Sequence, residues 1–111
     1  KRMEIKKGDV FETARIAGIN AVKQTPLLIP HCHQIPIESA DFDFETKEKE
    51  IIVNCQVKSF SKTGVEMEAL VGVTMALNTI WDMVKYLEKD KNGQYPATKI
   101  TDIKVIEKVK L

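Results

Sequence analysis

Two histidines and a cysteine stand together in the sequence as His31-Cys32-His33. Alternate residues of an extended segment point the same way, so both imidazoles can face one site. A zinc site needs a fourth donor, and the chain lacks the second pair of ligands that is typical of zinc sites. Two other interpretations stay open: one packed and one solvent-facing histidine, or an imidazole that binds a small ligand. We therefore predict no metal site here.

A second candidate is the loop of residues 59–64 and the acidic turn that follows it. Lys62 begins a Lys-Thr-Gly run, but the upstream glycine and the residue order of a phosphate-binding P-loop are missing. What remains is a helix N-terminus, where backbone N–H groups favour anions. Glu66 and Glu68, on either side of Met67, either complement the helix dipole or accept hydrogen bonds from a donor-rich base such as guanine.

The third candidate is an acid and a base, Asp82 and Lys85, three residues apart on a predicted helix. Alone, such a pair is most often a surface ion pair worth about 0.3 kcal/mol. The neighbours Trp81 and Met83 are apolar, however, and a partly buried lysine beside an aspartate can have its pKa tuned for acid–base catalysis. Lys7, just ahead of the first predicted helix, is a further candidate cation, although a lysine in such a turn is by default a solvated loop residue.

Two helices and a small sheet must position these residues. Asp9, followed three residues later by Glu12, is a capping box that predicts a helix from there to about Gln24, before Pro26 stops it. Three prolines in an apolar run predict a stiff, packed connection over residues 26–36. Small residues on the first helix predict a close approach to a sheet or another helix: Ala14, Ala17, Gly18 and Ala21.

Alternating apolar and polar residues predict two strands, over residues 40–45 and 51–58, joined by a charged hairpin loop. A last strand is predicted over residues 103–109, and a further strand at residues 2–6. With the helices, the order becomes βαββαβ. This is the order of a ferredoxin-like α+β sandwich, an antiparallel sheet with two helices on one face, and we expect a single domain over residues 1–111.

The second predicted helix, residues 65–89, is apolar almost all the way round except for a thin polar stripe that includes Asp82 and Lys85. One sheet cannot cover so much apolar surface, which predicts a subunit interface. Glu68 and Asp82 lie about 21 Å apart on this helix at the usual rise per residue, too far to contact one small substrate. If both are catalytic, a second copy, most simply antiparallel, must complete the site.

The composition excludes several classes of protein. With 30% charged residues and a net charge of +1, no bulk field attracts nucleic acid or a membrane surface. Seven aromatic residues and no basic, aromatic-studded strand argue against RNA binding. Two cysteines fit a reducing compartment, and no apolar stretch of about 20 residues or secretory signal is present. We expect a cytoplasmic protein.

Four blocks of the sequence carry a resemblance to a known family: residues 7–18, 28–33, 62–70 and 80–85. In order and spacing they are similar to the signature blocks of the molybdenum cofactor biosynthesis protein C family, the cyclic pyranopterin monophosphate synthases. The resemblance implies a ferredoxin-like subunit in a homohexamer, a trimer of dimers, with active sites between subunits. It implies a lyase that converts (8S)-3′,8-cyclo-7,8-dihydroguanosine 5′-triphosphate, a cyclised dihydro-GTP, to cyclic pyranopterin monophosphate and releases diphosphate.

The resemblance also implies roles for individual residues. The catalytic group would be Lys7, Asp82 and Lys85, and the substrate-binding positions Cys32, His33, Met67 and Glu68, with Glu66 in the same pocket. Lys62 would stabilise phosphate charge, and His31, where a leucine is common, would line the wall. The family carries an N-terminal extension and a Gly/Lys-rich tail that residues 1–111 do not include, and we expect the tail to add a phosphate contact.

The implied reaction needs repeated proton transfers and no redox step, so no cofactor is expected beyond Mg²⁺ that can accompany the triphosphate. The competing hypothesis is a catalytically silent ferredoxin-like oligomer that binds a nucleotide as a sensor. Turnover of the substrate separates the two.

Overall fold

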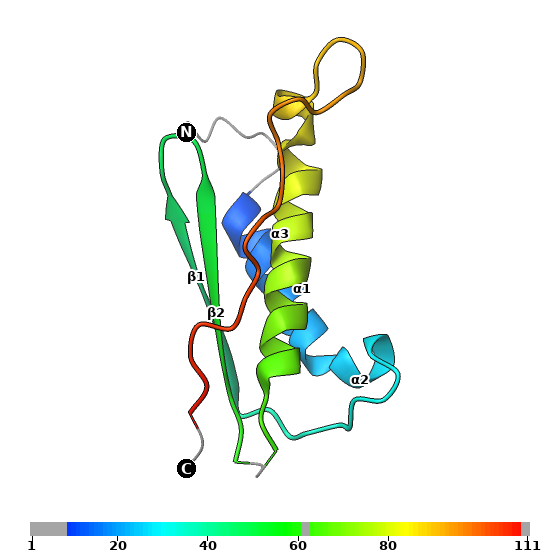
Figure 1. Ribbon diagram of the computed structural model, residues 1–111, viewed down its shortest axis with the longest axis vertical. Helices are drawn as coiled ribbons and strands as arrows, with labels where there is room; N and C mark the ends of the chain where they lie inside the picture. Colours follow the sequence, from blue (N-terminus) through cyan, green and yellow to red (C-terminus); the bar gives the residue numbers. More distant parts are fainter. Residues whose placement is uncertain (1–8, 61–62, 110–111) are drawn as a thin grey trace.

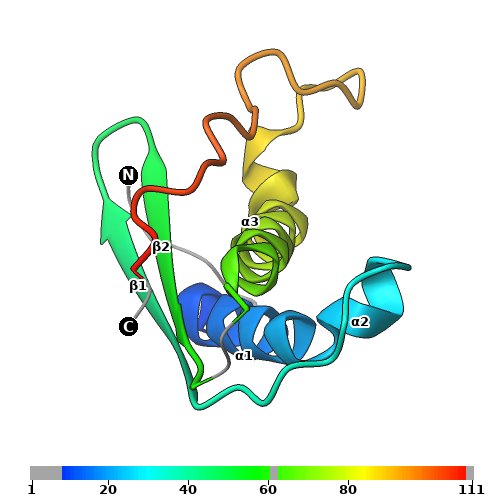
Figure 2. The ribbon, with the colours of Figure 1, turned by 60° about the horizontal axis from the view of Figure 1, so that its bottom comes forward.

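The computed structural model describes residues 9–60 and 63–109. In chain order, its elements are α1 (Val10–Lys23), α2 (Thr25–Leu28), β1 (Ser39–Thr46), β2 (Ile51–Lys58) and α3 (Glu66–Glu88). The two strands form an antiparallel hairpin, and α1 and α3 lie on one face of it (Figure 1, Figure 2). The predicted α+β class is confirmed. None of the described helices is long and apolar enough to cross a membrane.

α1 begins where the sequence predicts, at an N-cap formed by Asp9. The Asp9 carboxylate accepts a hydrogen bond from the backbone N–H of Glu12 at 3.1 Å, which satisfies one of the free amides of the first turn. The reciprocal half of the capping box is not formed, because the Glu12 carboxylate instead pairs with Arg15 at 3.2 Å. The helix ends at Lys23, close to the predicted end.

The segment after α1 differs from its prediction. Pro26 opens a short helix, α2, since a proline in the first turn of a helix loses no hydrogen bond. Leu27 is 83% exposed and Leu28 is also exposed, so the connection is not packed against its own chain as expected. The reason is that no other element of the described chain covers the outer side of α2 (Figure 2).

The hairpin confirms the two central strands. Phe42 pairs with Cys55 and Phe44 with Val53, so these side chains share the face that α1 and α3 cover. Phe42 is the buried centre of this layer. The side chains of Asp41, Asp43 and Glu45 alternate with them on the opposite face.

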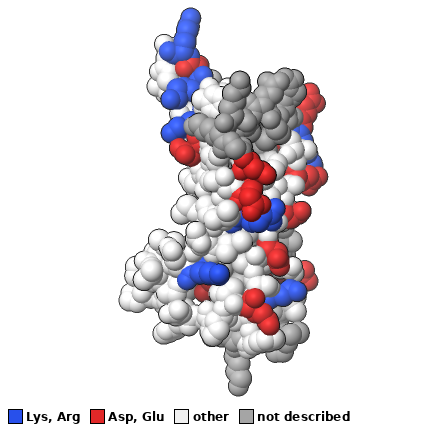
Figure 3. Space-filling model, turned by 180° about the vertical axis from the view of Figure 1, so that it is seen from behind, with Lys and Arg blue, Asp and Glu red and all other residues white. Residues whose placement is uncertain are grey.

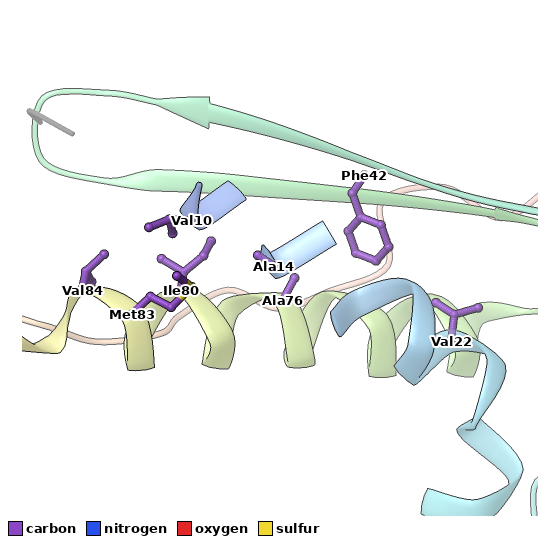
Figure 4. Close-up of a cluster of buried hydrophobic side chains, with 8 residues drawn as sticks. All are labelled: Val10, Ala14, Val22, Phe42, Ala76, Ile80, Met83 and Val84. Atoms are coloured by element: carbon purple, nitrogen blue, oxygen red, sulfur yellow. The ribbon is translucent and has the colours of Figure 1, made fainter. Parts of the chain in front are cut away.

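The core lies where α1, α3 and the hairpin meet (Figure 4). Ala14 of α1 and Ala76 of α3 are fully buried at the crossing of the two helices. A Cβ atom on Gly18 would lie 2.4 Å from Cζ of Phe42, and one on Gly72 would lie 2.5 Å from Cγ2 of Val22. The predicted use of small residues for a close approach is therefore confirmed, since the ring of Phe42 occupies the space that larger residues would need.

The predicted last strand is wrong for this structure. Residues 101–109 are exposed and form no strand; they run past α3 towards β2 (Figure 1). An alternating pattern makes a strand only beside a neighbour that pairs with it, and the described sheet has the two strands β1 and β2. The strand predicted at residues 2–6 lies outside the described residues. The four-stranded ferredoxin-like sheet is therefore not confirmed.

Candidate active site

The extended segment after α2 brings Cys32 to the first turn of α3. The Cys32 Sγ lies 3.9 Å from Oε2 of Glu68, within the range of a thiol hydrogen bond to a carboxylate. Glu68 is only 2% exposed although it lies in the first turn of the helix. Two candidate segments that are 36 residues apart in sequence thus meet within one chain.

The electrostatics of this contact keep Cys32 protonated. Partial burial first, and then the negative charge and hydrogen bond of Glu68, raise the pKa of the Cys32 thiol above its ordinary value. A thiol with a raised pKa donates a hydrogen bond and is a poor nucleophile at neutral pH. The pair therefore suits binding and orientation of a substrate rather than covalent catalysis.

Glu66, the first residue of the same helix, forms an ion pair that the sequence did not predict. The Nζ of Lys108 lies 3.3 Å from the Glu66 carboxylate. The Lys108 side chain also covers Gly64, because a Cβ there would lie 2.6 Å from its Cε. Lys108 lies in the predicted last strand, and nothing in that local pattern marks it as a partner of Glu66. An ion pair between residues 42 positions apart has no local signal in the sequence.

The remaining binding candidates of the described chain are neighbours in sequence of Cys32 and Glu68. His31 and His33 are exposed on either side of Cys32, and Met67 is exposed beside Glu68. The described residues contain no group of three or more His, Cys, Asp or Glu side chains arranged to hold a metal ion. Lys7 and Lys62, the two other predicted cations, lie outside the described residues.

Asp82 and Lys85 form the predicted pair near the other end of α3. The Lys85 Nζ lies 3.0 Å from the Asp82 Oδ1, and the Lys85 and Asp82 side chains are 42% and 69% exposed. The hydrogen bond to Asp82, followed by its negative charge, raises the pKa of Lys85. Lys85 is therefore an ammonium ion at neutral pH. The pair is not buried within one chain.

The two groups of candidate residues are kept apart by α3 itself. The helix is continuous from Glu66 to Glu88, so Glu68 and Asp82 are separated by about 21 Å of helix. The structure therefore brings Cys32, Glu66 and Glu68 together in one chain and leaves Asp82 and Lys85 at a distance.

Part of the surface of α3 remains uncovered within the chain. The helix buries Gly72, Ala76 and Ile80 against α1 and the hairpin, whereas Met75 on another side is 39% exposed. On the face shown in Figure 3, charged side chains of both signs are interspersed and a broad area is uncharged. No basic patch is therefore seen among the described residues of this face, which is the side of the molecule opposite to the view of Figure 1.

Residues 1–110 match the MoaC family. The chain is 60% identical to a protein of Pyrococcus abyssi (strain GE5 / Orsay) named "Probable cyclic pyranopterin monophosphate synthase", over 96% of this chain and 67% of that protein. Proteins of the same name from Archaeoglobus fulgidus and Methanosphaerula palustris are each 62% identical, over 96% and 94% of this chain and 69% and 68% of theirs.

Proposed function

The chain belongs to the MoaC family and is a lyase of molybdenum cofactor biosynthesis with cyclic pyranopterin monophosphate synthase activity, and we propose that two copies of the chain form each active site. The reaction converts (8S)-3′,8-cyclo-7,8-dihydroguanosine 5′-triphosphate to cyclic pyranopterin monophosphate with release of diphosphate. The observation that carries the proposal is the continuity of α3, which separates Glu68 from Asp82 and Lys85.

One half of the proposed site recognises the base. A buried carboxylate such as Glu68 accepts hydrogen bonds strongly, and the N–H groups of a guanine-derived ring are suitable donors. Cys32, held protonated beside it, adds a thiol, while His31, His33, Met67 and Glu66 line the pocket.

The other half moves protons and stabilises phosphate charge. Opening the purine ring and closing the pterin need repeated proton transfers, which an ammonium paired with a carboxylate can mediate. Lys85 supplies the acid and Asp82 the base, and Lys7 joins them. Closing the cyclic phosphate expels diphosphate, whose developing charge Lys62 and Lys85 stabilise. No redox cofactor is needed, and Mg²⁺ would enter with the triphosphate.

Association of two copies would bring the two halves of the site into contact. When the α3 helices of two chains pack antiparallel, the Glu68 end of one meets the Asp82 end of the other. The exposed apolar residues of α3 provide surface for this contact. We further propose the full homohexamer, a trimer of dimers, built from ferredoxin-like subunits. The two cysteines are free thiols, which supports a reducing, cytoplasmic location.

The test of this function is release of diphosphate from the cyclised dihydro-GTP by the purified chain. Lys85→Ala should lower the rate by at least about a hundredfold, the usual contribution of general acid–base catalysis. Lys89→Ala is the matched control, because Lys89 is an exposed lysine four residues after Lys85, at the C-cap of α3, and its loss should leave the rate unchanged. An unimpaired Lys85→Ala enzyme would overturn the catalytic assignment.

A further inference from the structure

The chain leaves α3 through a tightly closed loop. The Asp90 side chain accepts hydrogen bonds from the backbone N–H groups of Asn92 and Gln94, at 2.9 and 2.8 Å. The backbone N–H of Asp90 also donates to the carbonyl of Gln94 at 2.8 Å. Gly93 has φ = 77°, a backbone conformation that residues other than glycine rarely adopt. These bonds turn the chain back towards the helix it has just left (Figure 1).

The returning chain places an aromatic ring beside the end of α3 that carries Asp82 and Lys85. The rings of Tyr95 and Trp81 are in contact, with centroids 5.2 Å apart and planes tilted by 52°. The hydroxyl of Thr98 donates to the carboxylate of Glu88 at 2.8 Å and fixes the return a few residues later. Trp81 precedes Asp82 and lies one turn before Lys85, so Tyr95 covers the side of the helix that carries this lysine.

Tyr95 is also close enough to act on Lys85 electrostatically. The hydrogen bond to Asp82 and the Asp82 charge are the main causes of the raised pKa of Lys85, and the electrostatic interaction with Tyr95 is a smaller one. Asp82 on α3 and Tyr95 on the returning loop are the two titratable groups that raise this pKa in the described part of the chain.

We propose that Tyr95 is a positioning residue for Lys85: its ring, held against Trp81 by the closed loop, restricts the lysine side chain to the geometry in which its ammonium contacts Asp82. A lysine side chain has four flexible bonds, and a half-exposed ion pair does not by itself hold one rotamer. A rigid neighbour removes part of that freedom before the substrate binds, which favours proton transfer. The inference rests on the catalytic role proposed for Lys85.

The first test compares Tyr95→Ala with Tyr95→Phe. Tyr95→Ala should lower kcat about tenfold with KM within about twofold, because positioning is lost while substrate contacts remain. It should also move the alkaline limb of the pH–rate profile to lower pH, since a loosened contact with Asp82 lowers the pKa of Lys85. Tyr95→Phe keeps the ring and should restore kcat. Tyr86→Ala, an exposed tyrosine next to Lys85, is the matched control and should leave both parameters unchanged.

The second test does not depend on turnover. The chain is reductively methylated with ¹³C at its lysines, and the Lys85 resonance, assigned with Lys85→Arg, is titrated by NMR. The pKa of Lys85 should be lower in Tyr95→Ala than in Tyr95→Phe, because both variants lack the hydroxyl and only Tyr95→Ala also lacks the ring. An unchanged pKa, or a Tyr95→Ala protein that loses only thermal stability, would overturn the inference.

The two tests separate this inference from the proposed function. A wild-type chain that releases no diphosphate would defeat the proposed function, while the NMR titration would still decide the role of Tyr95. If Tyr95→Ala fails to fold, Tyr95→Leu fills the same space without an aromatic ring, and the same shift in pKa is expected of it.

Discussion

The substitutions Glu68→Ala and Asp82→Ala remove side chains from opposite ends of the proposed site. Each substitution by itself should inactivate the enzyme. A chain with Glu68→Ala still carries Asp82 and Lys85, whereas a chain with Asp82→Ala still carries the Cys32–Glu68 contact. Because about 21 Å of continuous helix separates the two ends, neither chain can form a complete site from its own residues. Assembled together, the two variants should regain activity.

The activity expected of the mixture depends on the fraction of sites that are complete. A site needs its Glu68 end from an Asp82→Ala chain and its Asp82 end from a Glu68→Ala chain. With equal amounts and random assembly, each condition is met with a chance of about one half, so about one quarter of wild-type activity should return.

The assay is diphosphate release after the two variants are unfolded together in urea and refolded, with two different affinity tags to verify mixed oligomers. Asp82→Ala mixed with Lys85→Ala is the matched control: both changes lie in the same half of the site, so no activity should return. The reasoning would be refuted if verified mixtures of Glu68→Ala and Asp82→Ala stayed inactive, or if the control mixture regained as much activity.

Three further predictions concern stability and thiol chemistry. Gly72→Ala should lower the free energy of unfolding in urea by about 1 kcal/mol, because its Cβ would lie 2.5 Å from Cγ2 of the buried Val22, and this overpacking outweighs the gain in helix propensity. Asp9→Ala should lower it by about 1 kcal/mol through loss of the N-cap bond. Glu68→Gln should speed alkylation of Cys32 by iodoacetamide at about pH 8, since removing the negative charge lowers the pKa of that thiol and raises the thiolate fraction.

Two of these predictions have a control within the same chain. Asp9→Asn keeps a capping oxygen and should change stability by only about a few tenths of a kcal/mol. A more stable Gly72→Ala protein would contradict the packing described for the helix crossing. Burial raises the pKa of Cys55 to about 12, so mass spectrometry should find this cysteine unlabelled while Cys32 reacts. Equal labelling of Cys32 in wild type and Glu68→Gln would contradict the role of Glu68.

Local patterns were sufficient to predict the central elements. The helical spacing of apolar residues, the Asp9 cap and the alternation in the hairpin all depend on near neighbours in the chain, and α1, α3, β1 and β2 have close to the predicted bounds. The blocks around His33, Glu68 and Lys85 were also enough to indicate the family, which the comparisons confirm.

Contacts between distant segments were decided by the tertiary structure. The hydrogen bond of Cys32 to Glu68, the ion pair of Glu66 with Lys108 and the packing of Tyr95 on Trp81 depend on the paths of irregular segments, which no periodic pattern encodes. The strand expected at residues 103–109 is not formed, for the same reason. Its alternation is a local property, but a strand forms only when hydrogen-bonding partners from elsewhere in the chain or from another copy lie beside it.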